Sequence, residues 1–318
     1  MKPIEILKPN FDPTGKLAAR ITKTASKQTY FTVRFLVDPD RRDEAFRAYA
    51  YFRWLDDKLD QLSAQDADRV AIVQREKALM EGCYQGALPF AVGVEEQLLV
   101  DLIRSDRLPN SGLQSYIRNM MAVLAFDAER RCQPISQQEL DTYTRHLAIA
   151  VTEALHYFIG NGSPSPQGET RYMAVTAAHI IHMLRDTVED TQAGYFNIPS
   201  EVLFADAIVP ENIDSEPYKA WIRHRIKLAR EYFTLGKRYI AHTKNLRCRI
   251  AGYAYIARFE GILTTIERDN YRLRPDYREH KNLRAILAMG WSTFCLTLWS
   301  TGLRWIQPIH MGRVKGDL

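Results

Sequence analysis

Residues 49–60 read YAYFRWLDDKLD, a polar stripe set in an otherwise apolar helical pattern. Side chains at the spacing i, i+4, i+7 and i+11 lie on one face of an α-helix. Four residues of the segment follow that spacing: Tyr49, Arg53, Asp56 and Asp60. The segment therefore predicts an amphipathic helix that carries two carboxylates about one turn apart, with an arginine beside them.

A second segment, residues 179–190, has the sequence HIIHMLRDTVED and a similar stripe. Its members, at the spacing i, i+3, i+7 and i+11, are His179, His182, Asp186 and Asp190. Arg185 adjoins this stripe. Carboxylates this close repel each other, and their burial is unfavourable unless a cation neutralises them. A lone aspartate pair more often marks a solvated helix face. Two such pairs on facing helices favour a site that holds a diphosphate through Mg²⁺ ions.

The rest of the chain also predicts helices, because apolar residues recur at three- and four-residue spacing and strand signals are sparse. We expect helices at roughly residues 42–63, 66–84, 93–105, 112–130, 137–159, 170–192, 216–244, 249–270 and 281–303. Ser136 with Glu139 forms a capping-box pattern, and Ser215 with Pro217 marks another helix start. Gly194 and Pro199 should end the helix that carries the second stripe.

No repeat of fixed period and no long polar linker divides the 318 residues. We therefore expect one all-α domain over residues 1–318, with an N-terminal extension over 1–20 and an apolar terminal helix over 285–303. The terminal segment contains no charged residue and approaches the minimum length of a membrane span. Gly290, Gly302 and several Ser and Thr residues dilute it, which favours a buried helix over membrane contact.

Composition narrows the function further. The net charge of +5 suits anionic substrates or an acidic membrane surface, and without a zinc-finger or RNA-binding signature we expect no nucleic-acid partner. No G-x-G-x-x-G segment supports a Rossmann nicotinamide domain. The four scattered cysteines indicate free thiols in a reducing compartment, and residues 1–23 lack the apolar run of a signal peptide. We expect a cytoplasmic protein, with peripheral membrane association as the alternative.

At the two stripes the sequence resembles the squalene/phytoene synthase family. Residues 53–60 are similar to the first aspartate motif of that family, and residues 184–190, followed by Gly194 and Ile198-Pro199, are similar to the second. Three further segments match in the same order: Ser26-Lys27, Glu139-Leu140 with Tyr143, and Asn270-Tyr271. The resemblance covers roughly residues 20 to 285.

The resemblance implies a single helical bundle of the isoprenoid synthase type around a central hydrophobic channel. It also implies head-to-head condensation of two farnesyl (C15) or geranylgeranyl (C20) diphosphates through a cyclopropylcarbinyl diphosphate, to a squalene- or phytoene-like product. The implied metal is Mg²⁺, with Mn²⁺ as a substitute, while the use of NADPH and the oligomeric state stay open.

The family also implies roles for particular residues. The metal ligands would be Asp56, Asp60, Asp186 and Asp190, with His182 in the place of a further ligand. The catalytic residues would be Tyr49, Arg53, Tyr143 and Arg185. The substrate-binding residues would be Ser26, Lys27, Arg53, Tyr143, Ile149, His179 and Phe259.

Several positions depart from the family pattern. His179 and His182 stand where the family has Gln and Asn, so His182 is a substitute ligand, a sign of altered metal geometry, or a buried, hydrogen-bonded histidine. Ile149 and Thr152 replace glycines and should narrow the channel, and Phe259 replaces a common tyrosine. Two alternatives therefore remain beside condensation: a relative that ionises one substrate and cyclises or transfers it, and a non-catalytic scaffold.

Overall fold

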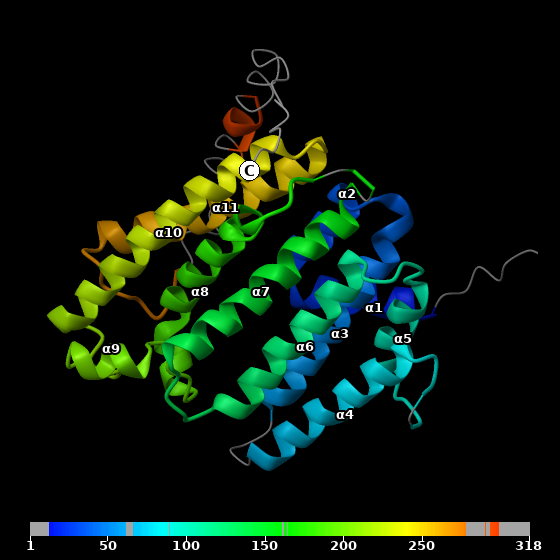
Figure 1. Cartoon of the computed structure of the whole chain (residues 1–318), viewed down its shortest axis with the longest axis horizontal. Helices are drawn as coiled ribbons and strands as arrows, with labels where there is room; N and C mark the ends of the chain where they lie inside the picture. The colour runs from blue at the N-terminus through cyan, green and yellow to red at the C-terminus, as the bar shows by residue number, and fades with distance from the viewer. Residues whose placement is uncertain are drawn as a thin grey trace, which may run out of the picture. The chain divides into compact units, whose positions relative to one another are not determined.

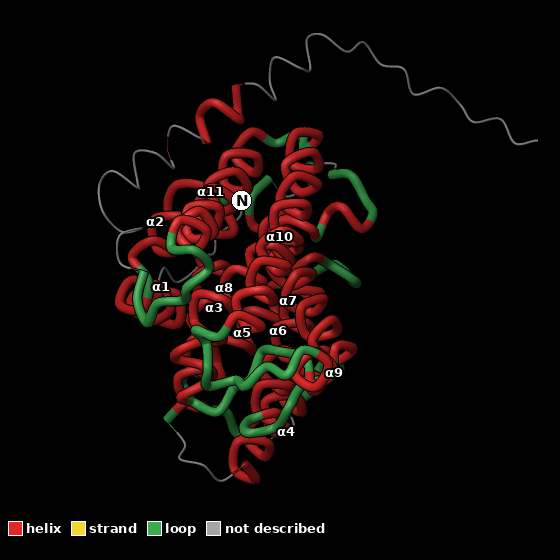
Figure 2. The backbone as a smooth tube through the Cα atoms, turned by 90° about the vertical axis from the view of Figure 1, so that its left-hand side faces the viewer, coloured by secondary structure: helices red, strands yellow, loops and turns green. Residues whose placement is uncertain are grey.

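The computed structural model describes residues 13–61, 66–88, 90–160, 162–163, 165–277, 290 and 293–298. Every regular element in these residues is a helix, as Figures 1 and 2 show. The only β pairing among them is an isolated bridge between Ile135 and Pro199. The predicted all-α class is therefore confirmed.

The elements follow one another as α-helices with two short 3₁₀ turns. Their bounds are α1 (Pro13–Ala25), α2 (Lys27–Leu36), η1 (Pro39–Arg41), α3 (Arg42–Asp60), α4 (Asp66–Tyr84), α5 (Glu96–Ser105), α6 (Gly112–Arg130), α7 (Gln137–Phe158), η2 (Glu169–Arg171), α8 (Met173–Gln192), α9 (Ser200–Ala205), α10 (Glu216–His242) and α11 (Leu246–Arg268).

Each helix expected between residues 42 and 270 is present, with bounds that differ by a few residues. Helices α1, α2 and α9 were not expected, because their windows of 13, 10 and 6 residues are short. The expected helix 281–303 lies mostly outside the described residues, although 293–298 are helical. Residues 1–12 of the expected N-terminal extension also lie outside them, and residues 13–20 belong to α1.

The helix ends confirm the local signals. Ser136 and Glu139 form the predicted capping box at the start of α7, and the Ser215 side chain caps α10, with Pro217 in its first turn. Gly194 follows α8 with a φ of +86°, a left-handed conformation that favours glycine. These short-range contacts fix where each helix begins and ends.

The chain forms two compact units, Met1–Glu129 and Arg130–Leu318, which are described separately. The single domain over residues 1–318 stays a prediction. In the first unit, α3 packs against α1, α2 and α5. One face of α3 enters the core, and its buried side chains recur at three- and four-residue spacing: Ala45, Ala48, Phe52, Leu55 and Leu59. Phe46, Ala50 and Tyr51 are buried as well.

A buried acidic cluster joins α3, α4 and α5 in the first unit. Tyr51 donates a hydrogen bond to Glu76 Oε2 at 3.0 Å, and Glu76 is fully buried. Burial, and after it the nearby charge of Glu96, raise the pKa of Glu76 to about 7, although the bond from Tyr51 opposes the rise. Glu96 stays ionised, because Gly93 N and Arg75 donate hydrogen bonds to it.

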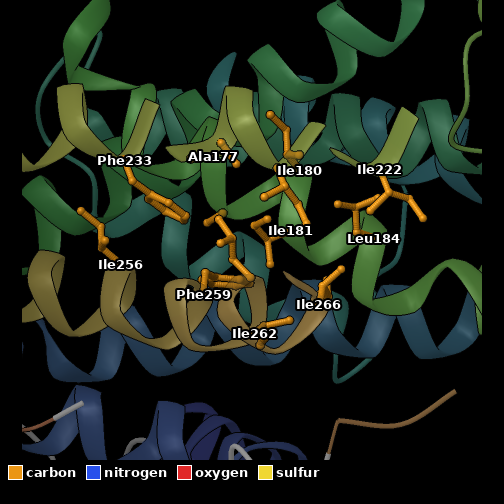
Figure 3. Close-up of a cluster of buried hydrophobic side chains, with 14 of the residues drawn as sticks. Ala177, Ile180, Ile181, Leu184, Ile222, Phe233, Ile256, Phe259, Ile262 and Ile266 are labelled. Atoms are coloured by element: carbon orange, nitrogen blue, oxygen red, sulfur yellow. The ribbon is translucent and has the colours of Figure 1, made fainter. Parts of the chain in front are cut away.

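In the second unit α8 packs against α7, α10 and α11. Figure 3 shows side chains from α8, α10 and α11 meeting in its core, among them Ile181, Phe233 and Ile262. Gly236 of α10 permits the closest approach, since a Cβ there would lie 2.7 Å from the Ala174 Cβ and 2.8 Å from its Cα. A Cβ at Gly252 would have its nearest contacts with the Ile240 side chain, the closest being Cδ1 at 2.8 Å.

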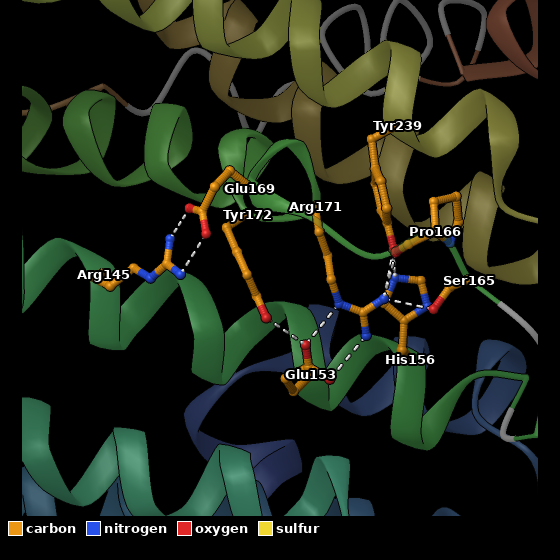
Figure 4. A network of polar contacts seen from close by, with 9 residues as sticks. All are labelled: Arg145, Glu153, His156, Ser165, Pro166, Glu169, Arg171, Tyr172 and Tyr239. Carbon is orange, nitrogen blue, oxygen red and sulfur yellow. Dashed lines mark hydrogen bonds and ion pairs between the residues drawn. The ribbon is translucent and has the colours of Figure 1, made fainter. Parts of the chain in front are cut away.

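A polar network lies between α7, η2 and α10 in the same unit (Figure 4). Arg171 donates to both oxygens of Glu153, at 2.7 and 2.9 Å, and its NH1 donates to Ser165 Oγ and to the Tyr239 hydroxyl oxygen. The Tyr239 hydroxyl lies 2.7 Å from His156 Nε2. Arg171 thus links Glu153 of α7 to Tyr239 of α10, and the network ties the two helices to the turn between them.

In the described part of the chain, no helix combines the length and the apolar character needed to cross a bilayer. The cytoplasmic location and the membrane contact of residues 285–303 stay predictions.

Candidate active site

The first aspartate stripe lies on α3, as the sequence predicted. Tyr49, Arg53 and Asp56 are half-buried and Asp60 is exposed, while Leu55 between them enters the core. The stripe is thus only partly open to solvent, and its exposure is greatest at Asp60.

Arg53 holds the carboxylates beside it. Its NH1 donates to Asp56 Oδ2 at 3.3 Å, and its Nε donates to Asp57 Oδ2 at 3.1 Å. The pKa of Asp56 is nevertheless raised to about 6, first by burial, then by the Asp60 charge, with a further contribution from Asp127 of α6; Arg53 opposes the rise. Negative charge therefore exceeds what Arg53 neutralises, and Asp127 belongs to this cluster although no sequence motif indicated it.

Ser26 and Lys27, predicted to bind substrate, lie at the start of α2. The Ser26 side chain caps the helix, since its Oγ accepts a hydrogen bond from Thr29 N at 3.1 Å. Lys27 is exposed. Capping already uses one acceptor position of the Ser26 hydroxyl.

The second stripe lies on α8 and centres on Asp186. Arg185 donates to both oxygens of Asp186, each at 2.5 Å, and His182 Nε2 lies 2.8 Å from Asp186 Oδ2. Burial raises the pKa of Asp186, but the hydrogen bonds from His182 and Arg185 outweigh it and lower the pKa to about 2. His182 is thus hydrogen-bonded, but it is exposed, so the burial expected with that role is wrong. The role of His182 as a metal ligand stays a prediction.

Asp190 is oriented by a residue that the sequence reasoning missed. Asn197 donates to Asp190 Oδ2 at 2.7 Å and accepts from Arg130 NH1 at 2.9 Å. The Arg130 guanidinium also lies 5.1 Å from the ring centres of Tyr143 and Tyr195. The only sequence signal was the position of Asn197 immediately before the matched pair at 198–199.

Aromatic rings and imidazoles adjoin the second stripe. The ring centres of Tyr143 and His179 are 5.2 Å apart, and Phe259 lies 6.3 Å from His182. His179 is 5% exposed, and neither ring nitrogen has a hydrogen-bond partner among the described residues. Burial, followed by nearby positive charges, lowers its pKa to about 3, so the imidazole is neutral near pH 7. Ile149 is half-buried on α7.

The predicted residues therefore fall into two groups. The first unit contains Ser26, Lys27, Tyr49, Arg53, Asp56 and Asp60, and the second contains Tyr143, Ile149, His179, His182, Arg185, Asp186, Asp190 and Phe259. The convergence of the groups on shared metal ions stays a prediction. Within the described ranges, no three His, Cys, Asp or Glu side chains are arranged to hold a metal ion.

Comparisons with known proteins agree on one family. The sequence matches squalene/phytoene synthase over residues 22–284. The chloroplastic phytoene synthase of Daucus carota is 24% identical over 280 residues, which cover 85% of this chain and 67% of that protein.

Solved structures share the fold. Squalene synthase HpnC from Alicyclobacillus acidocaldarius superposes with a TM-score of 0.65 at 18% identity, covering 82% of this chain and 95% of that one. A dehydrosqualene synthase in complex with a ligand superposes with a TM-score of 0.65 at 15% identity, covering 92% of this chain and 97% of that one. With the family match over most of the sequence, the all-α fold and the two aspartate helices, the chain belongs to the squalene/phytoene synthase family, a family of prenyltransferases that join prenyl diphosphates head to head.

Proposed function

We propose that this chain condenses two C15 or C20 prenyl diphosphates head to head, to a squalene- or phytoene-like product, with Mg²⁺ as its metal ion. The observation that carries the proposal is the crowding of carboxylates around Asp56, whose pKa is raised to about 6 by burial and by Asp60 and Asp127. Carboxylate oxygens in excess of nearby cations are the donor set that suits Mg²⁺.

The metal would be held by carboxylates of both stripes, Asp56 and Asp60 on α3 and Asp186 and Asp190 on α8. When bound, Mg²⁺ supplies Lewis-acid neutralisation of the charge on a departing diphosphate. Asn197 orients Asp190 for this role through its hydrogen bond to Oδ2. His182, in the place of a family ligand, would have to release Asp186 to join the metal.

The chain's own cations would bind the diphosphate. Arg185 is fixed by its two hydrogen bonds to Asp186, so its guanidinium is oriented before substrate arrives. Arg53 and Lys27 add positive charge in the first unit. In the second unit the half-buried ring of Tyr143 offers aromatic surface to an allylic cation, whereas Phe259, predicted to bind substrate, is 5% exposed and packs in the apolar core. The neutral imidazole of His179 does not repel the cation.

Product analysis tests the proposal. The purified chain is incubated with farnesyl or geranylgeranyl diphosphate and Mg²⁺, with Mn²⁺ or with a chelator, and with or without NADPH. We expect released diphosphate and a hydrocarbon of doubled carbon number, both lost with the chelator. Asp56→Asn and Asp190→Asn should abolish turnover at unchanged helical content, whereas Glu189→Gln, on an exposed neighbour, should retain it. Full activity of both aspartate variants would contradict the assigned roles.

The second candidate is ionisation of one prenyl diphosphate followed by cyclisation or transfer. It is favoured by Thr152, which stands where the family has glycine and is buried on α7, so that it adds bulk inside the bundle. A cyclic product of unchanged carbon number in the same assay would select this candidate. If the assay yields no hydrocarbon product and no released diphosphate, the scaffold alternative is the one that remains.

A further inference from the structure

The connection between α6 and α7 lies against the turn that follows α8, and hydrogen bonds join the two segments. The donors and acceptors are Arg131 Nε with Ala193 O at 3.0 Å, Cys132 N with Gly194 O at 2.8 Å, and Ser200 N with Ile135 O at 2.8 Å. The segments approach closely, since a Cβ at Gly194 would lie 2.7 Å from Cys132 Sγ. The backbone that carries Arg130 is therefore held against the backbone that carries Asn197.

Between these contacts, Arg130 decides which way the Asn197 amide points. A guanidinium only donates hydrogen bonds, so the Asn197 atom that lies 2.9 Å from Arg130 NH1 has to be the carbonyl oxygen Oδ1. The amide nitrogen Nδ2 then faces Asp190 and donates to its Oδ2 at 2.7 Å. Asn197 is 9% exposed, so little water competes for either contact. The orientation of the Asp190 carboxylate therefore depends on a donor one residue further away.

Two tyrosine rings hold the Arg130 guanidinium in place. The ring centres of Tyr143 and Tyr195 each lie 5.1 Å from its central carbon, within the range of a cation–π contact. Tyr195 is also tied to the aspartate, because its backbone N–H donates to the carbonyl oxygen of Asp190 at 2.7 Å. The guanidinium therefore cannot leave Asn197 without losing its contacts to the rings.

We propose that Arg130 is a positioning residue for metal binding: through Asn197 it holds the Asp190 carboxylate in the orientation that binds a divalent cation. The inference rests on the proposed function, in which Asp190 is a metal ligand. Without the Arg130 donor the Asn197 amide is free to rotate and to turn its own carbonyl oxygen toward Asp190, which would repel the carboxylate and displace it. Residues that hydrogen-bond to a metal ligand typically contribute roughly 10- to 100-fold to metal affinity.

The charge of Arg130 predicts the opposite effect. A guanidinium repels a nearby divalent cation, so its removal should tighten metal binding if charge alone mattered. The effect of position and the effect of charge therefore differ in sign, and the measured affinity decides between them. A purely structural role predicts a third result, in which Arg131, bonded to the backbone of the same turn, matters as much as Arg130.

Mn²⁺ binding to the full chain tests the inference without turnover. Electron paramagnetic resonance follows the free ion, and circular dichroism shows whether each variant is folded. We expect Asp190→Asn and Arg130→Gln to raise the Kd for Mn²⁺, the latter by roughly 10- to 100-fold. Arg130→Lys keeps a donor and should recover part of the loss. Arg131→Gln should bind as the wild type does, because the backbone bonds of Cys132 and Ser200 remain.

A double-mutant cycle with Asn197→Leu shows whether Arg130 acts through Asn197. Asn197→Leu alone should weaken Mn²⁺ binding about as much as Arg130→Gln does, and the double variant should bind no more weakly than Asn197→Leu. Three results would overturn the inference: unchanged or tighter binding in Arg130→Gln, an equal loss in Arg131→Gln, or a full additional loss in the double variant.

Asp190→Asn separates this inference from the proposed function. If Asp190→Asn weakens Mn²⁺ binding and Arg130→Gln does not, only the positioning role of Arg130 is wrong. If Asp190→Asn leaves Mn²⁺ binding unchanged, the metal role of Asp190 is wrong, and the positioning role is overturned with it.

Discussion

Replacement of Arg171 by methionine should destabilise the second unit strongly, because it breaks a buried ion pair on one side only. Arg171 is 4% exposed and forms two hydrogen bonds to Glu153, with further bonds to Ser165 and Tyr239 (Figure 4). Methionine fills a similar volume but donates nothing. Among the residues that the structure describes, only Tyr172 would still donate to the Glu153 carboxylate, at 3.2 Å.

The magnitude follows from burial. Removal of one partner from a buried pair leaves an uncompensated charge and costs about 3–5 kcal/mol. The pair between Arg145 and Glu169, also shown in Figure 4, has the same two-pronged geometry, but its side chains are 45% and 67% exposed. Solvent screens that pair, so Arg145→Met should change stability little.

Urea unfolding followed by circular dichroism measures both variants against the wild type. Glu153→Gln added to Arg171→Met should recover part of the loss, because it removes the unpaired charge. The pKa of His156 is lowered to about 4 by burial and then by the Arg171 charge, so Arg171→Met should raise it in a proton NMR titration. If Arg171→Met costs no more than Arg145→Met, the buried network does not hold this unit together.

Three further predictions concern single side chains. The pKa of Glu76 is raised from 4.5 to about 7, so its contribution to the free energy of unfolding is complete below pH 4.5 and is lost as pH rises through 7. The stability of the wild type should fall across that window. Parallel urea titrations of Glu76→Gln should not show the fall. The pKa of His179 is lowered from 6.5 to about 3, so its contribution to the free energy of unfolding is lost as pH falls from 6.5 to 3. His179→Gln should therefore move the midpoint of acid unfolding to a lower pH. An unchanged midpoint would argue against burial of a neutral imidazole. Gly236→Ala should cost about 1–3 kcal/mol by forcing α10 from α8, and Gly252→Ala less. Equal thermal shifts for the two glycine variants would mean that the α8 contact relaxes freely.

Helices could be predicted closely because their signals are local. The capping box of Ser136 and Glu139 and the cap at Ser215 act across three residues, so the sequence alone places the helix ends. The two aspartate stripes also follow from helical spacing. Helices α1 and α2 were not predicted because both are short, and short helices depend on tertiary packing, here against α3.

The partners of the stripe residues could not be predicted in the same way. Asn197 reaches Asp190 across a turn and meets Arg130, which lies 67 residues away in the sequence. Asp127 belongs to α6 but raises the pKa of Asp56 on α3. No spacing rule encodes such pairs, because they depend on which helix faces meet after packing.

The sequence by itself determined the all-α class, the approximate bounds of α3 to α8, α10 and α11, and the stripes of Asp56 with Asp60 and Asp186 with Asp190, because these depend on contacts within about one or two helical turns. Only the tertiary structure decided that His182 is bonded to Asp186 and that His179 is buried without a hydrogen-bond partner among the described residues. Burial and hydrogen bonding set the charge of a side chain, and both arise from neighbours that are distant along the chain.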